Sequence, residues 1–576
     1  MERAVSVLDA AILVVSAVEG VQSHTEAVWH ILEAYHVPVL IFLNKLDREG
    51  ARPDEVLAQI RARLSPAVTD LRAFQGSGTP DEPLLESLAE LDEALLDRYL
   101  AGDRAPEPWI DGLSRLVMAR GCFPVMAGSA LLGEGIDSFL RVTRRLVRTD
   151  YEGKGLEPFS AVCFRVRHDA QRQRACFLKL LSGSLRVRNP LPGDPEGRKA
   201  PELRVYHGER WRCVEQASAG DVIAIPGMDG VRPGLVLGRG APVPFRSEPM
   251  SAADLLWDMA AVPSFRMAEA VALLEDEDPS LSMERAGDRI GIHVMGGIQL
   301  QILQQLLRER FGYEVTFGPR RVLYRETIAA PVVGIGHYEP LRHYAEVHLR
   351  LVPGQPGSGV TFRSRVHVDD LALNWQRLIE THVFEKTHRG VLTGAPLTDV
   401  CVELLAGRVH LKHTEGGDLR EATYRAIRQA LMQARSVLLE PLCRFDITVP
   451  RESYGTVLGS LNAMTDTLET EPMGAEELRI TGEAPYAAFS RWQDSFLPQT
   501  HGRGSLRVWA SRYAPCADAD EIVARADYHP LADDTPDSVF CAHGAGYTVA
   551  WYQVPEFAHI PRKSYEALLD EEDHTR

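Results

Sequence analysis

An apolar run at residues 37–43 ends directly in the tetrapeptide Asn-Lys-Leu-Asp at residues 44–47. Two more short apolar runs accompany it, at residues 11–17 and 123–127. An amphipathic stretch over residues 25–35 separates the first two runs, so this part predicts a strand, a helix and a second strand. Short strands that are apolar along their whole length are typical of a parallel sheet covered on both faces. The sequence therefore predicts that the chain opens with a parallel α/β domain.

The tetrapeptide has chemistry that suits a guanine base. The Asp47 carboxylate can accept hydrogen bonds from guanine N1–H and the exocyclic amine, while the Lys45 stem can lie along the purine face. Open parallel sheets bind ligands at the carboxyl ends of their strands. A helix cap after a buried strand explains the tetrapeptide alone equally well. The Gly-Ser-Ala turn at residues 128–130 favours the guanine interpretation, because small residues let backbone N–H groups approach guanine O6. The predicted guanine-binding residues are Asn44, Lys45, Asp47, Ser129, Ala130 and Leu131.

The composition is that of a large protein with several domains. The chain has 576 residues, of which 45% are hydrophobic, and its apolar runs are of strand length. We expect no transmembrane span and no signal peptide. The eight cysteines are scattered without a Cys-x-x-Cys pair, so we expect neither disulfides nor a zinc site, in a reducing cytoplasm. His543 invites a catalytic interpretation, but no nucleophile or metal partner is evident and a glycine-rich turn is the better prediction.

Several motifs together resemble the translational GTPases of the elongation factor G class, and within it the ribosomal protection tetracycline resistance proteins. Residues 3–17, with Gly-Val-Gln at 20–22, resemble the family stretch that follows its Asp-x-Pro-Gly-His switch. Residues 321–327 resemble its Val-x-Tyr-Arg-Glu-Thr, and residues 438–441 its Leu-Leu-Glu-Pro. The resemblance covers about nine tenths of the chain, with the guanine motif in the family's order.

The resemblance also shows which family parts are missing. The phosphate loop, the Mg²⁺-binding switch threonine and the Asp-x-Pro-Gly-His would all precede Met1, and none recurs later. Phosphoryl transfer depends on those parts, so we expect no Mg²⁺ site, no catalytic residue and negligible hydrolysis, although GTP and Mg²⁺ are cofactors of the family. We expect a misplaced start codon rather than a gene fragment or a true truncation. The strand at residues 11–17 should then be a bare sheet edge with exposed apolar residues.

The resemblance implies a multidomain α/β and α+β architecture. It comprises a truncated GTP-binding domain of the phosphate-loop type with a parallel sheet, a β-barrel, ferredoxin-like α+β domains and a ribosomal-protein-S5-like domain. Short alternating strands over residues 161–188 fit the barrel, and a Pro-rich stretch at 241–249 is a plausible linker. The predicted divisions are a GTP-binding domain 1–150, β-barrel 155–245, α+β domain 250–328, domain IV with the decoding-centre tip 329–445, α+β domain 446–515 and C-terminal extension 516–576, which should dock on the tip domain.

The predicted tip lies at residues 408–418, between a strand and a helix expected over 419–437. His, Lys and Arg side chains on such a loop can stack on and hydrogen-bond irregular RNA. A second candidate, at residues 353–359, could equally be an ordinary hairpin loop. The predicted ribosome-contacting residues are Arg408, His410, Lys412, His413 and Thr414.

The charge distribution permits two interpretations of this region. The net charge of −17 argues against RNA binding if it is evenly spread. Residues 404–435, however, hold six Lys or Arg against three Asp or Glu, a net +3. Such a patch could face phosphate. A solvated helix face with i,i+4 ion pairs is the alternative.

The resemblance predicts a monomeric cytoplasmic protein that binds GTP or GDP and the ribosome, contacting rRNA and ribosomal proteins without a membrane. Its expected activity is tetracycline resistance by ribosomal protection. Two features favour this branch: the Gly-Gly-Ile-Gln-Leu-Gln at residues 296–301, where elongation factor G has a histidine, and a tip without the translocase's Asp-Ser-Ser-Glu. An elongation factor G-like translation factor and a nucleotide-independent ribosome-binding protein remain alternatives.

Overall fold

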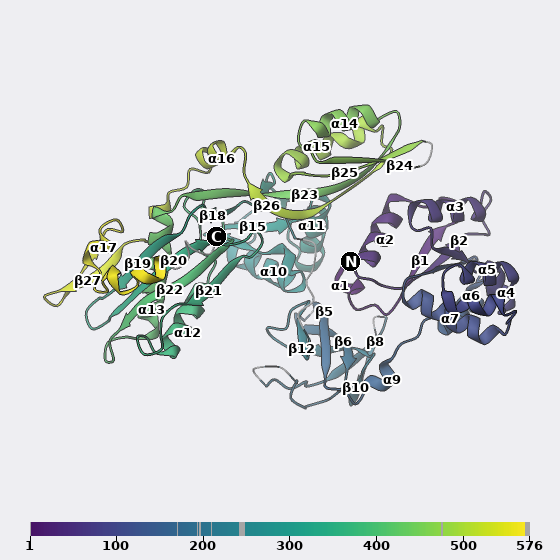
Figure 1. Cartoon of the computed structure of the whole chain (residues 1–576), viewed down its shortest axis with the longest axis horizontal. Helices are drawn as coiled ribbons and strands as arrows, with labels where there is room; N and C mark the ends of the chain where they lie inside the picture. The colour runs from purple at the N-terminus through teal and green to yellow at the C-terminus, as the bar shows by residue number, and fades with distance from the viewer. Residues whose placement is uncertain are drawn as a thin grey trace.

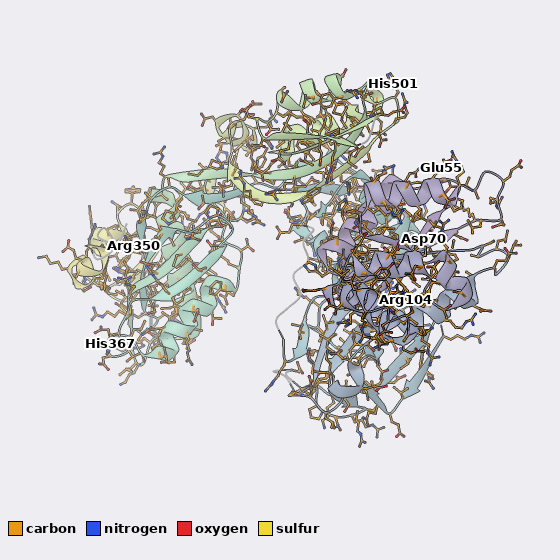
Figure 2. The ribbon with its side chains drawn as sticks, turned by 45° about the vertical axis from the view of Figure 1, so that its right-hand side comes forward. Glu55, Asp70, Arg104, Arg350, His367 and His501 are labelled. Carbon is orange, nitrogen blue, oxygen red and sulfur yellow. The ribbon has the colours of Figure 1, made fainter. Side chains whose placement is uncertain are left out.

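A computed structural model describes residues 2–169, 171–192, 194, 197–208, 210–240, 248–473 and 476–570. The chain forms an α/β unit, a β unit and three further units with mixed helices and strands, arranged in an elongated molecule (Figure 1). The labelled Asp70 and Arg104 lie on the first unit, far from Arg350 and His367 at the other end (Figure 2). Most of the predicted linker, residues 241–247, lies outside the described residues. Within the described part, no helix is both long and apolar enough to cross a bilayer.

The first unit contains the predicted parallel sheet. Its four strands run in the order β1 (Ala11–Ser16), β2 (Val39–Asn44), β4 (Phe123–Ala127) and β3 (Val68–Asp70). Ser16 pairs with Asn44 and Leu43 with Ala127, so the carboxyl ends of three strands meet at one side of the sheet. The prediction of a parallel α/β domain is confirmed. The helices are α1 (Glu2–Val5), α2 (Ser23–Ala34), α3 (Pro53–Arg63), α4 (Arg72–Ser77), α5 (Glu82–Ala89), α6 (Glu93–Leu100), α7 (Pro106–Met118) and α8 (Ile136–Leu146).

Strand β1 is an edge strand of the described sheet, as predicted. Leu13 and Val15 point into a core shared with α2 and α3, and are 7% and 2% exposed. Ile12 and Val14, on the opposite face, are 47% and 57% exposed. A largely apolar strand with one exposed face is unusual, because a parallel sheet is normally covered on both sides.

The second unit is the predicted antiparallel β domain. A six-stranded sheet and a two-stranded ribbon curl around one apolar core. The short helix α9 (Tyr151–Lys154) leads into it. The six strands are β12 (Val236–Gly238), β5 (Ser160–His168), β6 (Arg174–Ser182), β11 (Val222–Pro226), β8 (Leu203–His207) and β9 (Arg210–Val214), and the ribbon pairs β10 (Gln216–Ser218) with β7 (Ser184–Arg186).

The third unit has the mixed helices and strands of the predicted α+β domain. Helix α10 (Ser264–Glu277) and helix α11 (Gly297–Phe311) pack on one sheet. The chain order strand, helix, two strands, helix, strand is that of a ferredoxin-like unit. Its strands are β13 (Ser251–Leu256), β14 (Glu284–Ala286), β15 (Arg289–Val294), β16 (Thr316–Phe317) and β17 (Arg321–Val322).

The acidic end of α10 joins the first three units. Asp276 accepts hydrogen bonds from Arg174 of the β domain at 2.6 and 2.8 Å. Glu277 accepts the His168 N–H at 2.8 Å, and its carbonyl oxygen accepts Arg3 Nη1 at 2.7 Å. Charged groups at the carboxyl end of one helix therefore hold the first two units against the third.

The fourth unit contains a six-stranded sheet that the C-terminal segment completes. The sheet order is β21 (Val360–Ser364), β22 (Val400–Val409), β20 (Ala345–Pro353), β19 (Val332–Tyr338), β27 (Ser538–Ala542) and β28 (Ala545–Val549). The predicted docking of the C-terminal extension on this domain is confirmed, because β27 pairs with β19. His543 and Gly544 form the turn of the β27–β28 hairpin, with φ values of 52° and 82°.

Helix α12 (Leu373–Phe384) and helix α13 (Gly416–Gln433) cover this sheet. Helix α13 lies so close to β19 that a Cβ added at Gly336 would meet the Ala422 carbonyl oxygen at 1.8 Å. The helix predicted over residues 419–437 ends earlier than expected. Ala434 is extended and residues 436–439 pair with β18 (Arg325–Ile328), so sheet pairing ends the helix.

The candidate tip at residues 353–359 is not a hairpin loop. Strands β20 and β21 lie on opposite sides of β22, the first antiparallel to it and the second parallel. Residues 354–359 therefore cross from one side of β22 to the other. They lie where Pro353 pairs with Val400, the opposite end of the domain from residues 410–415.

The fifth unit shares the long strand β23 (Ser436–Pro450) with the fourth. Residues 436–439 of β23 pair with β18, whereas residues 442–450 pair with β25 (Glu477–Pro485). The order β23, α14 (Tyr454–Asn462), β24 (Leu468–Met473), β25, α15 (Tyr486–Gln499) and β26 (Ser505–Pro515) is again ferredoxin-like. The remaining helices are α16 (Ala519–Ala526), α17 (Val554–Phe557) and α18 (Glu566–Asp570).

Candidate functional site

The two segments predicted to read guanine lie together at the carboxyl ends of β2 and β4. The Ala130 N–H donates to Asn44 Oδ1 at 2.9 Å. The Leu46 N–H donates to the Gly128 carbonyl at 3.3 Å, and the Gly128 N–H donates to Leu43 at 3.0 Å. These bonds fix the Asn-Lys-Leu-Asp segment against the Gly-Ser-Ala turn before any ligand binds.

Gly128 is required by the close approach of two backbone segments. A Cβ at this position would lie 2.2 Å from the Glu134 carbonyl oxygen and 3.0 Å from the Phe42 ring. Ser129 is fully buried, and its hydroxyl accepts the Leu132 N–H at 3.3 Å. Its side chain therefore shapes the turn.

The other predicted residues line the partly exposed side of this site. Lys45 has a φ of 66°, and its Nζ lies 3.1 Å from a Glu19 carboxylate oxygen. The Asp47 carboxylate lies 4.0 Å from Arg48 Nε. Leu131 is 76% exposed. An anionic acceptor, an amide and a lysine stem at one sheet edge fit the base of a guanine nucleotide. The 576 residues contain no phosphate loop, so the residues of this site fit the base of the nucleotide and not its phosphates or Mg²⁺.

The loop predicted to meet RNA lies at the far end of the fourth unit. Strand β22 ends at Val409, opposite Ala345 at the start of β20. Tyr344, just before β20, holds the loop: its carbonyl accepts Thr414 Oγ1 at 2.6 Å and its N–H donates to His413 at 3.1 Å. We refer to residues 408–414 as the distal loop.

The distal loop presents basic and aromatic groups to solvent. Arg408, His410, Lys412 and His413 are exposed, and the rings of His410 and His413 stack with centroids 4.5 Å apart. Thr414 is half-buried, and its hydroxyl also accepts the His410 N–H at 2.7 Å. Four of the five predicted ribosome-contacting residues are thus accessible, while Thr414 shapes the loop.

Comparisons with known proteins cover both regions. Residues 1–149 match the family model of the elongation factor Tu GTP binding domain. Residues 320–435 match elongation factor G, domain IV, and residues 437–521 match the elongation factor G C-terminus. Tetracycline resistance protein TetM from Streptomyces lividans is 30% identical over 551 residues, which cover 90% of this chain and 84% of that protein.

This chain belongs to the elongation factor G class of translational GTPases. Tetracycline resistance protein TetP from Clostridium perfringens is 27% identical over 92% of this chain and 85% of that protein. Elongation factor G 2 from Syntrophus aciditrophicus is also 27% identical, over 87% of this chain and 85% of that factor. A crystal structure from Thermus thermophilus superposes with a TM-score of 0.56 and 26% identity, covering 91% of this chain and 86% of that one.

In this elongation factor G homologue, the arginines of α13 do not form a phosphate-facing surface. Arg425 and Arg428 are 9% and 3% exposed, and Arg425 pairs with Glu421. Arg420 donates to Glu385 at 2.7 Å. Partial burial would raise the pKa of Glu385, but hydrogen bonds from Tyr424, Arg420 and His382 lower it to about 2. The interpretation of residues 404–435 as one basic patch is wrong, because α13 packs into the domain and its arginines are engaged there.

Tyr344 is a residue of the candidate RNA-contacting region that sequence reasoning missed. It contacts the distal loop only through the tertiary fold, because strands β20 and β22 bring the two segments together. No local pattern around residue 344 signals this role.

Proposed function

We propose that this chain is a ribosome-associated factor of the tetracycline ribosomal protection type, whose distal loop contacts rRNA. The observation that carries the proposal is the placement of Arg408, His410, Lys412 and His413 at the free end of an elongated domain. TetM and TetP, both tetracycline resistance proteins, match nine tenths of the chain. We further propose a monomer in the cytoplasm with the six domain divisions given above.

The geometry of the distal loop suits irregular RNA. The stacked imidazoles of His410 and His413 offer a flat face for an unpaired base, and Arg408 and Lys412 supply charge for phosphates. A hydrogen bond from the Thr414 hydroxyl to the Tyr344 carbonyl, and one from the Tyr344 N–H to His413, anchor the loop to the sheet. A loop held in this way loses little conformational entropy when it binds.

For the nucleotide, we propose that Asn44, Lys45 and Asp47 bind the guanine base with the turn at residues 129–131. The family's GTP and Mg²⁺ chemistry needs a phosphate loop and switches that these 576 residues do not contain. We therefore propose that the chain by itself binds guanine nucleotides weakly and does not hydrolyse GTP. Hydrolysis by the 576-residue protein, measured beside a version extended upstream in frame, would contradict this part.

Ribosome binding tests the proposal directly. The 576-residue chain should sediment with ribosomes, and replacing Arg408 and Lys412 together by alanine should weaken binding by at least about tenfold and flatten its salt dependence. Arg377, an exposed arginine on α12 of the same domain, provides the control, because Arg377→Ala removes a charge away from the loop. Equal binding by the loop variant and the control would refute a role of the distal loop.

A second assay separates the two family activities. The upstream-extended protein should restore translation by tetracycline-inhibited ribosomes and should not advance tRNAs in a translocation assay. Translocation without restored drug-inhibited translation would instead identify an elongation factor G-like translation factor. Ribosome binding that guanine nucleotides do not change would identify a nucleotide-independent ribosome-binding protein.

A further inference from the structure

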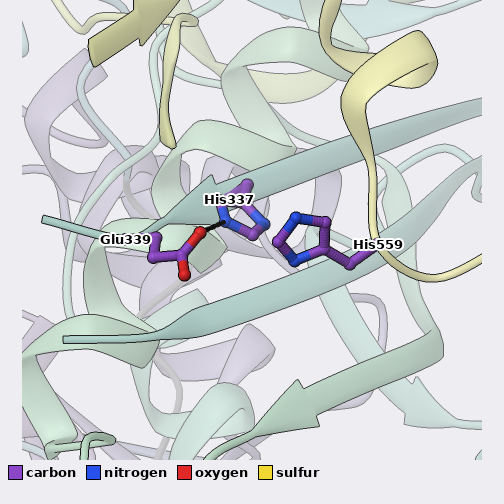
Figure 3. A group of neighbouring side chains, drawn as sticks. All are labelled: His337, Glu339 and His559. Carbon is purple, nitrogen blue, oxygen red and sulfur yellow. Dashed lines mark hydrogen bonds and ion pairs between the residues drawn. The ribbon is translucent and has the colours of Figure 1, made fainter. Parts of the chain in front are cut away.

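A cluster of three potential metal ligands lies beside the distal loop, where the C-terminal segment docks. His337 is near the end of β19, Glu339 follows that strand, and His559 follows α17 in the C-terminal segment (Figure 3). One potential ligand atom from each residue lies within 4.8 Å of the others. In the described part of the chain, this is the only group of three such residues.

The spacing of these atoms is compatible with a single small ion. His337 Nε2 and Glu339 Oε2 are 3.1 Å apart. Tetrahedral Zn²⁺ with bonds of about 2.0–2.1 Å requires ligand atoms roughly 3.3 Å apart. One pair already has this separation, and His559, which is exposed, has to move by only about 1–2 Å to complete the site.

His337 lies between two carboxylates. The ring is fully buried, with Nδ1 2.7 Å from Glu346 Oε2 and Nε2 3.1 Å from Glu339 Oε2. Both ring nitrogens therefore face carboxylate oxygens, a setting that suits a bound cation.

Glu346 orients the His337 ring and anchors the backbone at His559. Besides His337, its carboxylate accepts the backbone N–H of His559 at 2.9 Å and of Ile560 at 2.8 Å. A carboxylate that fixes the second ring nitrogen of a ligating histidine is a recurrent feature of zinc sites. The Phe540 ring stacks on one face of the His337 ring, with centroids 4.0 Å apart, and restricts its rotation.

We propose that His337, Glu339 and His559 bind one Zn²⁺ that fastens the C-terminal segment to the distal end of the fourth unit. Two imidazoles and a carboxylate are a typical zinc donor set, whereas Ca²⁺ and Mg²⁺ prefer oxygen ligands alone. Water would occupy the fourth position. The ion would also stiffen the distal loop, because the Tyr344 ring stacks on His559 and its backbone holds His413 and Thr414.

The three proposed ligands do not form a zinc motif that is recognisable in the sequence. His337 and Glu339 alternate at the end of one strand, which places both side chains on the same side. His559 reaches them only because the C-terminal hairpin adds to the edge of β19. The expectation of no zinc site rested on cysteine spacing, which does not detect a site assembled from distant histidines.

Zinc titration of the 576-residue protein against a chromogenic chelator tests the proposal. The wild type should bind one Zn²⁺ per chain, and His559→Ala and Glu339→Gln should each weaken binding by at least about 100-fold. His529→Ala is the matched control, since His529 is an exposed histidine of the same segment that also lies near a carboxylate, at 3.7 Å from Asp527. It should bind as the wild type does.

A Co²⁺ spectrum, combined with the unfolding temperature, distinguishes loss of the metal site from loss of the fold. Co²⁺ added to the wild type should give the strong visible absorption of a four- or five-coordinate site, and His559→Ala should abolish this absorption. When a chelator removes all metal, His559→Ala and the wild type should unfold at the same temperature. A wild type that binds no Zn²⁺ would mean that a proton alone bridges His337 and Glu339, and would overturn the proposal. Unchanged zinc affinity in both ligand variants would overturn it as well.

Discussion

Replacing Glu326 by glutamine should loosen the contact between β18 and the loop before β22. Glu326 is fully buried. Its Oε1 accepts the Thr393 N–H at 2.8 Å and the Thr393 hydroxyl at 2.9 Å, and its Oε2 accepts the Leu392 N–H at 2.9 Å. The Ala395 N–H is a weaker donor at 3.3 Å. One buried carboxylate therefore satisfies the donors of a whole loop, and Gly390 leaves room for it.

The magnitude follows from these contacts. Glutamine has the same shape but places an NH₂ group against one of the N–H donors, so one bond is lost and a buried donor is left unpaired, at about 1–3 kcal/mol. The remaining bonds change from charge-assisted to neutral, which costs roughly a further 1–2 kcal/mol. We expect Glu326→Gln to destabilise this region by about 4 kcal/mol.

Amide hydrogen exchange measures this change locally, which matters because a chain of several domains does not unfold in one step. The amides of Leu392 and Thr393 should exchange about a thousand times faster in Glu326→Gln, since each 1.4 kcal/mol corresponds to a factor of ten. Glu421→Gln is the control, because its pair with Arg425 is partly exposed and contributes less than about 1 kcal/mol. Less than tenfold acceleration, or equal acceleration in the control, would refute the argument.

Three more predictions follow from individual contacts. Gly128→Ala should force the turn away from the Glu134 carbonyl oxygen and destabilise the first unit by about 2 kcal/mol. It should also weaken guanine nucleotide binding. An unchanged melting temperature and an unchanged affinity in a fluorescent nucleotide titration would contradict the close contact. Burial, with a smaller effect of Lys386, lowers the pKa of His388 to about 4. The unfolded chain therefore binds a proton at a higher pH than the folded chain, so about 3 kcal/mol of folding stability should be present above pH 6.5 and lost as the pH falls from 6.5 to 4. Melting curves of His388→Gln should show a weaker pH dependence than those of the wild type, and identical curves would refute the effect. Arg428→Met removes hydrogen bonds to the backbone of two segments, at Arg389 and at Pro530 and Asp534, the bond to Pro530 being 2.6 Å long. It should release residues 528–534 to limited proteolysis at a cost of about 3 kcal/mol; unchanged cleavage would show that these bonds do not hold the segment.

The sequence alone predicted the elements whose signal is local. The apolar runs at residues 11–17, 37–43 and 123–127 became β1, β2 and β4 because short, fully apolar segments are buried strands in a parallel sheet. The order of the guanine motif and the Gly-Ser-Ala turn placed both at one sheet edge, since the carboxyl ends of parallel strands coincide. The exposed apolar face of β1 was predicted from the family resemblance, which implies neighbouring strands that this sequence does not contain.

The tertiary structure decided what depends on contacts between distant residues. The charges of α13 look like a surface patch in the sequence, but Arg428 is buried and donates hydrogen bonds to residues 389–390 and to the C-terminal segment. In the sequence, Glu326 is part of a motif shared with the family, whereas in the structure it is a buried hydrogen-bond acceptor for the loop at residues 392–395. His337 and His559 meet only because the last hairpin adds to an open strand. Periodicity reports burial along one element, whereas the partner of a buried charge is set by which elements pack together.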